Sequence, residues 1–181
     1  MRFGIPPKAT SGVTRRVLLA MLAAAAAPVP DGFRLDDYRA PVPDTVPGAS
    51  VVHAAEIQAL IAIGGAVLID VLPAPRRPDT MRPGSPWIPR PHLSLPGALW
   101  WPEIGRGALP PATEARLLER LHEVVGDGLV VFFCLPECWM SWNATRRAVT
   151  MGFHAAWFPE GTEGWHAAGH DLVPVTPETI E

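Results

Sequence analysis

The segment Phe132–Asn143 constrains this chain more than any other, because it contains both cysteines and two of the seven tryptophans. An apolar run rich in Val and Phe, Leu129–Phe133, follows a turn signal at 126–128, and this pattern predicts a buried strand. Residues Asn143–Met151 predict a helix that ends at Gly152. Both cysteines are therefore expected on the loop between the end of a strand and the start of a helix.

Cys134 is the first residue after the predicted strand, at the edge where open α/β sheets usually bind ligands. Backbone N–H groups converge at such a loop, and they favour a negative charge such as a thiolate. We therefore expect the sulfur of Cys134 to be accessible to incoming molecules and cradled by amide hydrogens, with Cys138 as its partner thiol. The other candidate site residues of this loop are Leu135, Pro136, Glu137, Trp139, Met140, Ser141, Trp142 and Asn143.

The rest of the chain alternates between apolar segments of strand length and segments with helical spacing. This alternation predicts an α/β fold, with a central parallel sheet and helices on both faces. The expected helices, besides 143–151, are His53–Ile63, Thr113–Val125 and a short one that follows the turn at 160–165 and closes at Gly169. The expected strands, besides 129–133, are Ala66–Val71, a short one within Leu95–Trp100, and Ala155–Phe158.

Two features near the second strand have open interpretations. Asp70 either lines the site at the strand end or orders the loop that follows it. The connection 73–97 is long and rich in Pro and Arg, and connections of this length are often functional. It either folds over the cysteine loop and supplies cations to an anionic substrate, or forms a solvated flap.

The N-terminal residues 1–27 have the pattern of a cleavable export signal. A basic region with Arg15-Arg16 precedes an apolar core, and a run of alanines ends at Ala27. The arginine pair suggests export by the twin-arginine route. The apolar core is shorter than the roughly 20 residues of a membrane span, which favours cleavage over anchoring. The predicted organisation is the signal, an extended Pro-rich arm at 28–49, one domain at 50–176 and a tail at 177–181.

Removal of the signal changes the charge of the chain. Four of the fifteen basic residues precede residue 28, so eleven arginines remain against eighteen acidic residues, a net charge of −7. This balance argues against nucleic acid or an anionic membrane as a partner. No lysine remains, which excludes lysine-based catalysis, and no cofactor is expected.

The order of these parts resembles a rhodanese-like domain over roughly residues 50–175. The segments that carry the resemblance are Leu68–Val71, Leu95–Ala98, Val130–Cys134, Met151–Phe153 and Pro159–Trp165. The resemblance implies that Cys134 occupies the position of the nucleophile that carries a persulfide. The loop departs from the usual sulfurtransferase pattern because it has no arginine.

Two stretches, Cys138–Ala144 and Trp157–Trp165, are similar to the signature of the rhodanese-like PQQ-dependent catabolism-associated CXXCW-motif proteins, although three residues separate the cysteines here. The resemblance implies a periplasmic protein. Its expected partners are a small sulfur-containing substrate and a PQQ-dependent alcohol dehydrogenase or the cytochrome c of that enzyme.

The two cysteines are open to three interpretations. In the first, Cys134 attacks a sulfur donor or a disulfide and Cys138 resolves the product, as in a sulfurtransferase or thiol–disulfide oxidoreductase. In the second, both cysteines, Met140 and a histidine such as His154 or His166 bind Cu(I). In the third, they form a structural disulfide in a non-catalytic partner-binding module, because exported cysteines are oxidised by default.

The tryptophans also leave alternatives. Trp139 and Trp142 are three residues apart and share one helix face, where they either line the site and exclude water or pack in the core. Trp100 and Trp101 are neighbours on a predicted strand, so one of them is a candidate for an exposed docking surface.

Three polar residues on the helix after the cysteine loop have expected places. Asn143 is expected to cap the helix start. Arg146 and Arg147 are expected to face solvent in preference to an anion in the loop.

Overall fold

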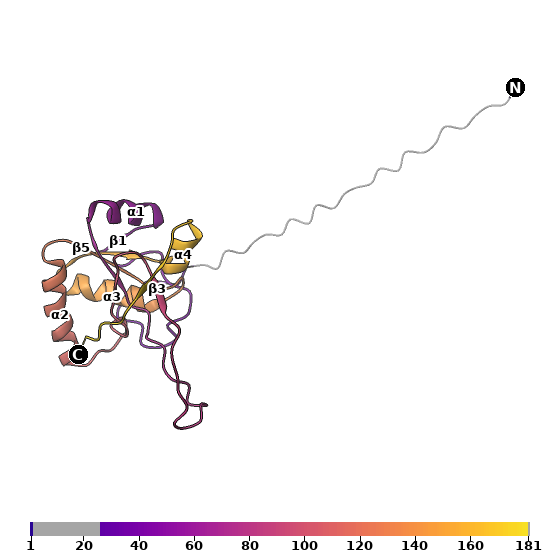
Figure 1. Cartoon of the computed structure of the whole chain (residues 1–181). Coiled ribbons are helices and arrows are strands. Elements are labelled where there is room, and N and C mark those ends of the chain that lie inside the picture. The colour runs from indigo at the N-terminus through magenta and orange to yellow at the C-terminus, as the bar shows by residue number, and fades with distance from the viewer. Residues whose placement is uncertain (2–25, 181) are drawn as a thin grey trace.

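The computed structural model describes Met1 and residues 26–180, and its centre is a five-stranded parallel sheet (Figure 1). The strand order is β1-β6-β5-β2-β4, with every neighbouring pair parallel. The strands are β1 (Ser50–Val51), β2 (Val67–Asp70), β4 (Leu99–Trp100), β5 (Leu129–Phe133) and β6 (His154–Phe158). A separate antiparallel pair joins β3 (His92–Ser94) to β7 (Val173–Val175).

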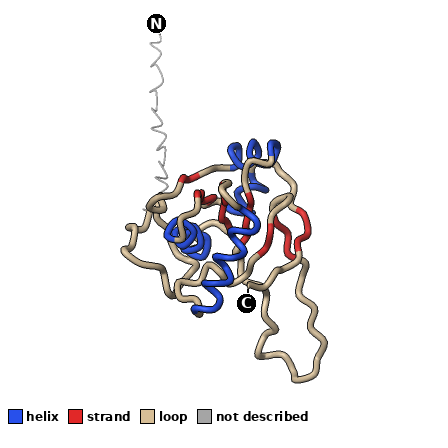
Figure 2. Tube along the Cα trace, turned by 90° about the vertical axis from the view of Figure 1, so that its left-hand side faces the viewer, coloured by secondary structure: helices blue, strands red, loops and turns tan. Residues whose placement is uncertain are grey.

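Helices cover both faces of the central sheet (Figure 2). One face packs against α2 (Pro111–Val125) and α3 (Trp139–Thr150), and the other against α1 (Ala54–Ile63) and α4 (Gly161–Ala167). The predicted α/β class, with a central parallel sheet and helices on both faces, is confirmed.

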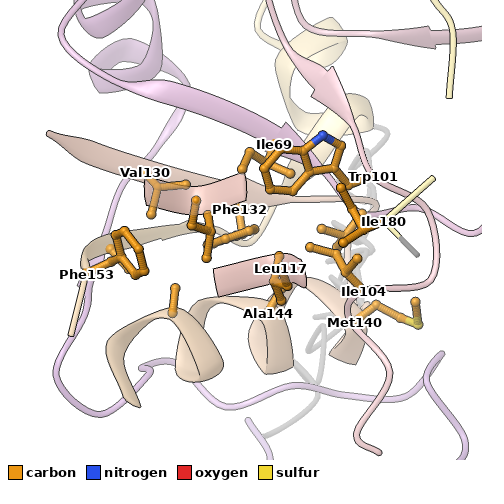
Figure 3. Packing of buried hydrophobic residues seen from close by; sticks show 14 of the residues in the cluster. Ile69, Trp101, Ile104, Leu117, Val130, Phe132, Met140, Ala144, Phe153 and Ile180 are labelled. Atoms are coloured by element: carbon orange, nitrogen blue, oxygen red, sulfur yellow. The ribbon is translucent and has the colours of Figure 1, made fainter. Parts of the chain in front are cut away.

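Strand β5 supplies side chains to both cores. Val130 and Phe132 pack with Leu117 of α2 and Ala144 of α3 (Figure 3), whereas Val131 packs in the core on the opposite face. Because neighbouring side chains of a strand point to opposite faces, a strand covered on both sides is apolar at every position. This explains the continuous apolar run from which the sequence predicted β5.

The predicted boundary of α3 is wrong at its start. The helix begins at Trp139, four residues before the expected Asn143, and Cys138 is its N-cap residue. The residues 139–142 are therefore helical. Asn143 does not cap the helix: it is fully buried inside it.

The expectation that Trp100 or Trp101 forms an exposed docking surface is wrong. Both are buried, because both faces of the sheet are covered: Trp101 packs in the core with α2 and α3, and Trp100 packs against His92, with the ring centroids 4.3 Å apart. The segment 177–180 packs on this region: the Glu178 N–H donates to the Trp100 carbonyl at 2.8 Å, and Trp101 Nε1 donates to the Glu178 carboxylate at 3.0 Å. Ile180 is buried in the same core.

The connection between β2 and β3, residues 73–91, extends away from the body of the molecule in both views (Figures 1 and 2). We call it the projecting loop. All residues from 75 to 91 are exposed or half-buried, so of the two interpretations left open for this connection, the solvated flap fits the structure.

The export signal was predicted at residues 1–27. Almost all of it lies outside the described part of the chain, which leaves out residues 2–25. Within the described residues, no helix has the length and apolar character of a membrane span.

Candidate functional site

Cys134 and Cys138 form a disulfide at the carboxyl edge of β5. Cys134 follows the last residue of the strand, Cys138 precedes α3, and their Cα atoms are 6.5 Å apart. The two residues are 0% and 2% exposed. The sulfur of Cys134 is therefore sealed inside the protein, and the expectation that it is presented to incoming molecules is wrong for this disulfide form.

Oxygen atoms surround the sulfur of Cys134. Its Sγ lies 3.6 Å from the Leu135 carbonyl oxygen and 3.7 Å from Ser141 Oγ. The Ser141 hydroxyl donates to the Cys138 carbonyl and accepts from Trp157 Nε1, both at 3.0 Å. Within the described residues no backbone N–H donates to this sulfur, so the predicted amide cradle is absent.

The start of α4 holds the backbone of Cys134. The Thr162 N–H donates to the Cys134 carbonyl at 2.9 Å. Gly161 has a φ of +55°, and a Cβ on it would lie 2.2 Å from the same carbonyl oxygen. This position therefore requires glycine, both for its left-handed backbone and for the close approach. Sequence reasoning placed Gly161 in a turn but missed this contact.

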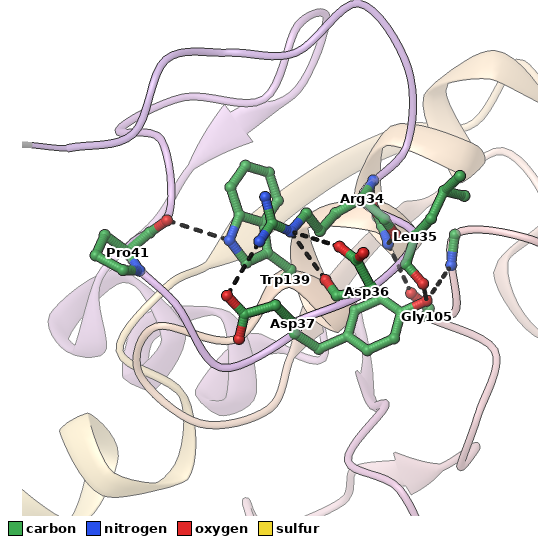
Figure 4. Close-up of polar contacts among 10 residues, drawn as sticks. Arg34, Leu35, Asp36, Asp37, Pro41, Gly105 and Trp139 are labelled. Carbon is green, nitrogen blue, oxygen red and sulfur yellow. Dashed lines mark hydrogen bonds and ion pairs between the residues drawn. The ribbon is translucent and has the colours of Figure 1, made fainter.

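The N-terminal arm, residues 28–49, covers the other end of the disulfide. Arg39 forms a β-bridge with Cys138, and the Trp139 N–H donates to the Tyr38 carbonyl at 2.9 Å. Trp139 Nε1 donates to the Pro41 carbonyl at 3.1 Å (Figure 4), and the Arg34 guanidinium lies over the Trp139 ring at 5.4 Å. Access to Cys138 therefore requires displacement of the arm.

Two further α3 side chains anchor the arm. Trp142 Nε1 donates to the Thr45 carbonyl at 2.9 Å. Asn143 accepts from the Arg34 N–H at 2.9 Å and donates to the carbonyls of Arg34 at 2.8 Å and Gly105 at 3.0 Å. The candidate site residues Trp142 and Asn143 thus bind the arm, and Trp139 packs edge-on against Trp142 within the same cluster.

Arg146 and Arg147 of α3 were expected to face solvent, but Arg147 is buried and Arg146 is half-buried against the arm. Arg147 is 2% exposed, and its guanidinium donates to the carbonyls of Ile104 at 2.9 Å and Arg106 at 2.8 Å. Burial lowers the pKa of Arg147 from its ordinary value, and the partly exposed Glu114 carboxylate opposes this shift. Arg146 donates to the Pro30 carbonyl of the arm at 2.8 Å.

Asp70 does not lie at the disulfide. Its flanking residues Ile69 and Val71 pack in the same core as Cys134, so its own side chain points to the opposite face of the sheet. The carboxylate is fully buried and accepts from the Leu72 N–H at 2.9 Å and from Ser94 Oγ at 2.6 Å, and it contacts His92 Nε2 at 2.7 Å. Of the two interpretations, the ordering of the following loop fits these contacts.

The proposed copper ligands are not assembled in this form. Both sulfurs are used in the disulfide, and Met140 is buried beside them in the core. His154 begins β6 and so lies at the opposite edge of the sheet, while His166 is exposed on α4. Among the described residues, no group of three or more His, Cys, Asp or Glu side chains is placed to hold a metal ion.

A pocket of about 560 Å³ lies beside the cysteine loop. The arm segment 41–45 forms one wall, and Glu137 of the loop, with a φ of +51°, contributes to another. His53 Nδ1 lies 2.6 Å from a Glu160 carboxylate oxygen at the rim. No sequence pattern pointed to this pocket, because its walls come from segments that lie far apart in the chain, among them 41–45, 51–53 and 157–160.

No protein-family model matches the chain, and no curated protein matches it significantly. Several solved structures are similar. The BH2092 protein from Bacillus halodurans is 16% identical, with a TM-score of 0.49, over 70% of this chain and 77% of that one. A thiosulfate sulfurtransferase from Pseudomonas aeruginosa is 22% identical, with a TM-score of 0.47, over 74% of this chain and 22% of that one. The human single-domain sulfurtransferase TSTD1 is 22% identical, with a TM-score of 0.40, over 66% of this chain and 97% of that one.

Proposed function

We propose that this chain is an exported, rhodanese-like thiol–disulfide protein that handles sulfane sulfur at Cys134 and resolves the product with Cys138. The observation that carries the proposal is the disulfide itself, which joins residues four apart at the carboxyl edge of a central parallel strand. This edge is where ligand-binding loops of open α/β sheets lie.

A purely structural role explains this bridge poorly. The loop it closes is short, and loop-closure entropy then stabilises the fold by only about 2 kcal/mol. Both ends are already held by hydrogen bonds from outside the loop, through Thr162 to the Cys134 carbonyl and through Tyr38 to the Trp139 N–H. Because these hydrogen bonds do not involve the sulfurs, we expect the backbone to keep its place when the sulfurs change oxidation state.

The proposed reaction begins with reduction of the disulfide by an external dithiol, which supplies two electrons and is itself oxidised to a disulfide. The Cys134 thiolate then attacks the outer sulfur of a donor, such as thiosulfate, and forms a persulfide as sulfite leaves. The Cys138 thiolate attacks the inner sulfur of this persulfide, which restores the disulfide and releases hydrosulfide. The state with the bridge intact is the end point of each cycle.

The arm controls this cycle because it covers the Cys138 end of the disulfide. Arg39 and Tyr38 lie on Cys138 and Trp139, so the donor and the reductant reach the sulfurs only after this part of the arm moves. The loop offers the thiolate no arginine and places Glu137 at the surface, which predicts a slow attack on anionic donors.

We further propose that the protein acts in the periplasm, in support of a PQQ-dependent alcohol oxidation system. Support for this assignment comes from the resemblance of Cys138–Ala144 and Trp157–Trp165 to the CXXCW-motif proteins and from the signal-like residues 1–27.

The test is mass spectrometry of the reduced protein after incubation with thiosulfate, combined with a thiosulfate:cyanide sulfurtransferase assay. Cys138→Ser keeps the nucleophile and loses the resolving thiol, so it is expected to accumulate the mass of one added sulfur. The wild type is expected to return to the disulfide with release of sulfide, and Cys134→Ser to remain unmodified. If Cys138→Ser gains no sulfur from thiosulfate or from a neutral polysulfide, the proposed chemistry is wrong.

The second candidate is a non-catalytic partner-binding module with a structural disulfide. The observation that favours it is the burial of both cysteines, at 0% and 2% exposure. This function predicts no sulfur uptake in any variant, together with tight binding of a dehydrogenase or a cytochrome c. Copper delivery is a third possibility, and one Cu(I) per reduced chain that is lost in Cys138→Ser is its signature.

A further inference from the structure

The projecting loop carries the main unpaired positive charge of the described chain. It contains four arginines and one acidic residue, Asp79, a net charge of +3 within a protein whose described part is otherwise acidic. Arg76 is paired with Glu103 at 3.3 Å, but no ion pair of the described residues involves the other three loop arginines. These three are Arg77, Arg82 and Arg90, and all are exposed.

Arginines elsewhere are used within the fold. Of the seven other arginines among the described residues, five form ion pairs, and Arg146 binds backbone carbonyls of the arm. Arg39 lies on the arm without an ion pair among the described residues. The loop therefore differs from the rest of the described chain in that three of its four arginines form no ion pair there.

The backbone of the loop holds these cations in extended conformations. Each of the three unpaired arginines directly precedes a proline, at 77–78, 82–83 and 90–91. A residue before proline is restricted to the β and polyproline II regions. The loop also contains local hydrogen bonds, from the Met81 N–H to the Pro78 carbonyl at 3.0 Å and from the Ser85 N–H to the Arg82 carbonyl at 3.1 Å. Restricted loops lose less entropy when they bind.

The loop also exposes an apolar side chain beside these charges. Ile88 is 88% exposed, the highest value among the large hydrophobic residues of the domain, and it follows the half-buried Trp87. Protein interfaces are typically enriched in aromatic residues and arginine. The loop therefore carries an exposed apolar side chain together with three unpaired guanidinium groups.

We propose that the projecting loop is the docking element of this protein for another protein, whose complementary surface is acidic with an apolar pocket for Ile88. The root of the loop follows β2 at the carboxyl edge of the sheet, and the Val71 N–H donates to the Phe133 carbonyl beside Cys134 at 3.0 Å. Docking therefore brings the partner to the edge of the molecule that contains the disulfide. The inference does not depend on the redox chemistry of the cysteines.

Two other occupants fit the observations less well. An anionic membrane is a broad surface, and it would bring negative charge towards the acidic body as well as towards the loop. A second copy of the chain carries the same net negative charge, so the two bodies repel each other. A protein with a local acidic patch contacts the loop without bringing negative charge close to the acidic body.

The test is site-specific photo-crosslinking in the cells that make the protein. A benzophenone amino acid replaces Ile88 in the loop, and the matched control replaces Ile63, which is 78% exposed at the end of α1. We expect one discrete adduct with an acidic protein from position 88, and none with that protein from position 63. The adduct is identified by mass spectrometry, and that protein is then purified as the binding probe.

Binding of this probe is measured with the wild type, with a triple variant R77Q/R82Q/R90Q, and with the control variant Arg116→Gln on α2. We expect the triple variant to weaken binding about tenfold and high salt to do the same, with the control within about twofold. Self-adducts, adducts with lipid, no adduct, or binding that is indifferent to the three arginines would each overturn the proposal.

Discussion

The arm at 28–49 and the projecting loop at 73–91 are both rich in proline and irregular, yet they have opposite relationships to the domain. The arm lies against α3 and is held by Trp139, Trp142 and Asn143, whereas the loop extends into solvent and makes its hydrogen bonds mostly with itself. The difference comes from partners and not from composition. The side chains of α3 donate to arm carbonyls, whereas among the described residues the exposed Arg76–Glu103 ion pair is the only ion pair or side-chain hydrogen bond that joins the loop to the domain.

The two Pro-rich segments are placed for different functions. A segment that is held over a disulfide controls access to it, while a segment that projects with unpaired charges is free to contact another molecule. The two Pro-rich regions thus correspond to the two proposals, the arm to the chemistry of the cysteines and the loop to docking.

The largest predicted effect concerns the anchor of the arm at Asn143. Asn143→Ala leaves the Arg34 backbone groups and the Gly105 carbonyl without their partner, and we expect a loss of about 3 kcal/mol in the free energy of unfolding. Urea denaturation measures this loss. Ser85→Ala in the projecting loop is the control and is expected to change stability by less than about 0.5 kcal/mol. A loss below about 1 kcal/mol for Asn143→Ala would show that the arm is not anchored there.

A smaller effect is expected when the disulfide is reduced. Since the bridge closes a short loop, reduction is expected to lower the free energy of unfolding by about 2 kcal/mol and to leave the fold intact. Hydrogen exchange of the Trp139 N–H, which donates to the arm, then reports whether the arm loosens with the bridge. Complete unfolding on reduction would contradict the proposal that the bridge is dispensable for the fold.

The tryptophan that binds the arm offers a matched pair of variants. Trp142→Phe keeps an aromatic ring but loses the N–H that donates to the Thr45 carbonyl, and we expect a loss of about 1.5 kcal/mol. Trp87→Phe makes the same change in the projecting loop and is expected to have almost no effect. Thermal denaturation of both variants compares the two regions directly, and equal losses would remove the distinction between them.

The smallest effect is predicted for removal of the projecting loop. Replacement of residues 77–90 by a short Gly-Ser linker keeps Arg76, whose ion pair with Glu103 is exposed and contributes little. Loop closure depends only weakly on loop length, so the stability is expected to change by about 0.5 kcal/mol or less. Circular dichroism and denaturant titration check this. A large loss would show that the loop supports the domain.

The sequence predicted the elements that depend on local pattern. The continuous apolar run of β5 identified a strand buried on both faces, and the spacing of apolar residues identified α2, which begins two residues before its predicted start. The strands β1, β3 and β7 were missed because two or three residues are too few for an alternation to appear.

The environment of the candidate site was not predictable in the same way. The proximity of Cys134 and Cys138 followed from their spacing, but their burial depends on the arm, which begins about a hundred residues earlier in the chain. Asn143 was expected at a helix cap since its type favours caps. Its actual partners are the backbones of Arg34 and Gly105, and no local pattern points to them.

The sequence by itself determined the α/β class, the order of the main strands and helices, and the position of the cysteine pair between β5 and α3. These features follow from residue periodicity and turn residues, which act over a few positions. Only the tertiary structure decided that the disulfide is sealed, that Asp70 faces away from it, and that one Pro-rich segment packs while the other projects. These outcomes depend on hydrogen bonds and packing between distant segments, and such contacts exist only once the chain has folded.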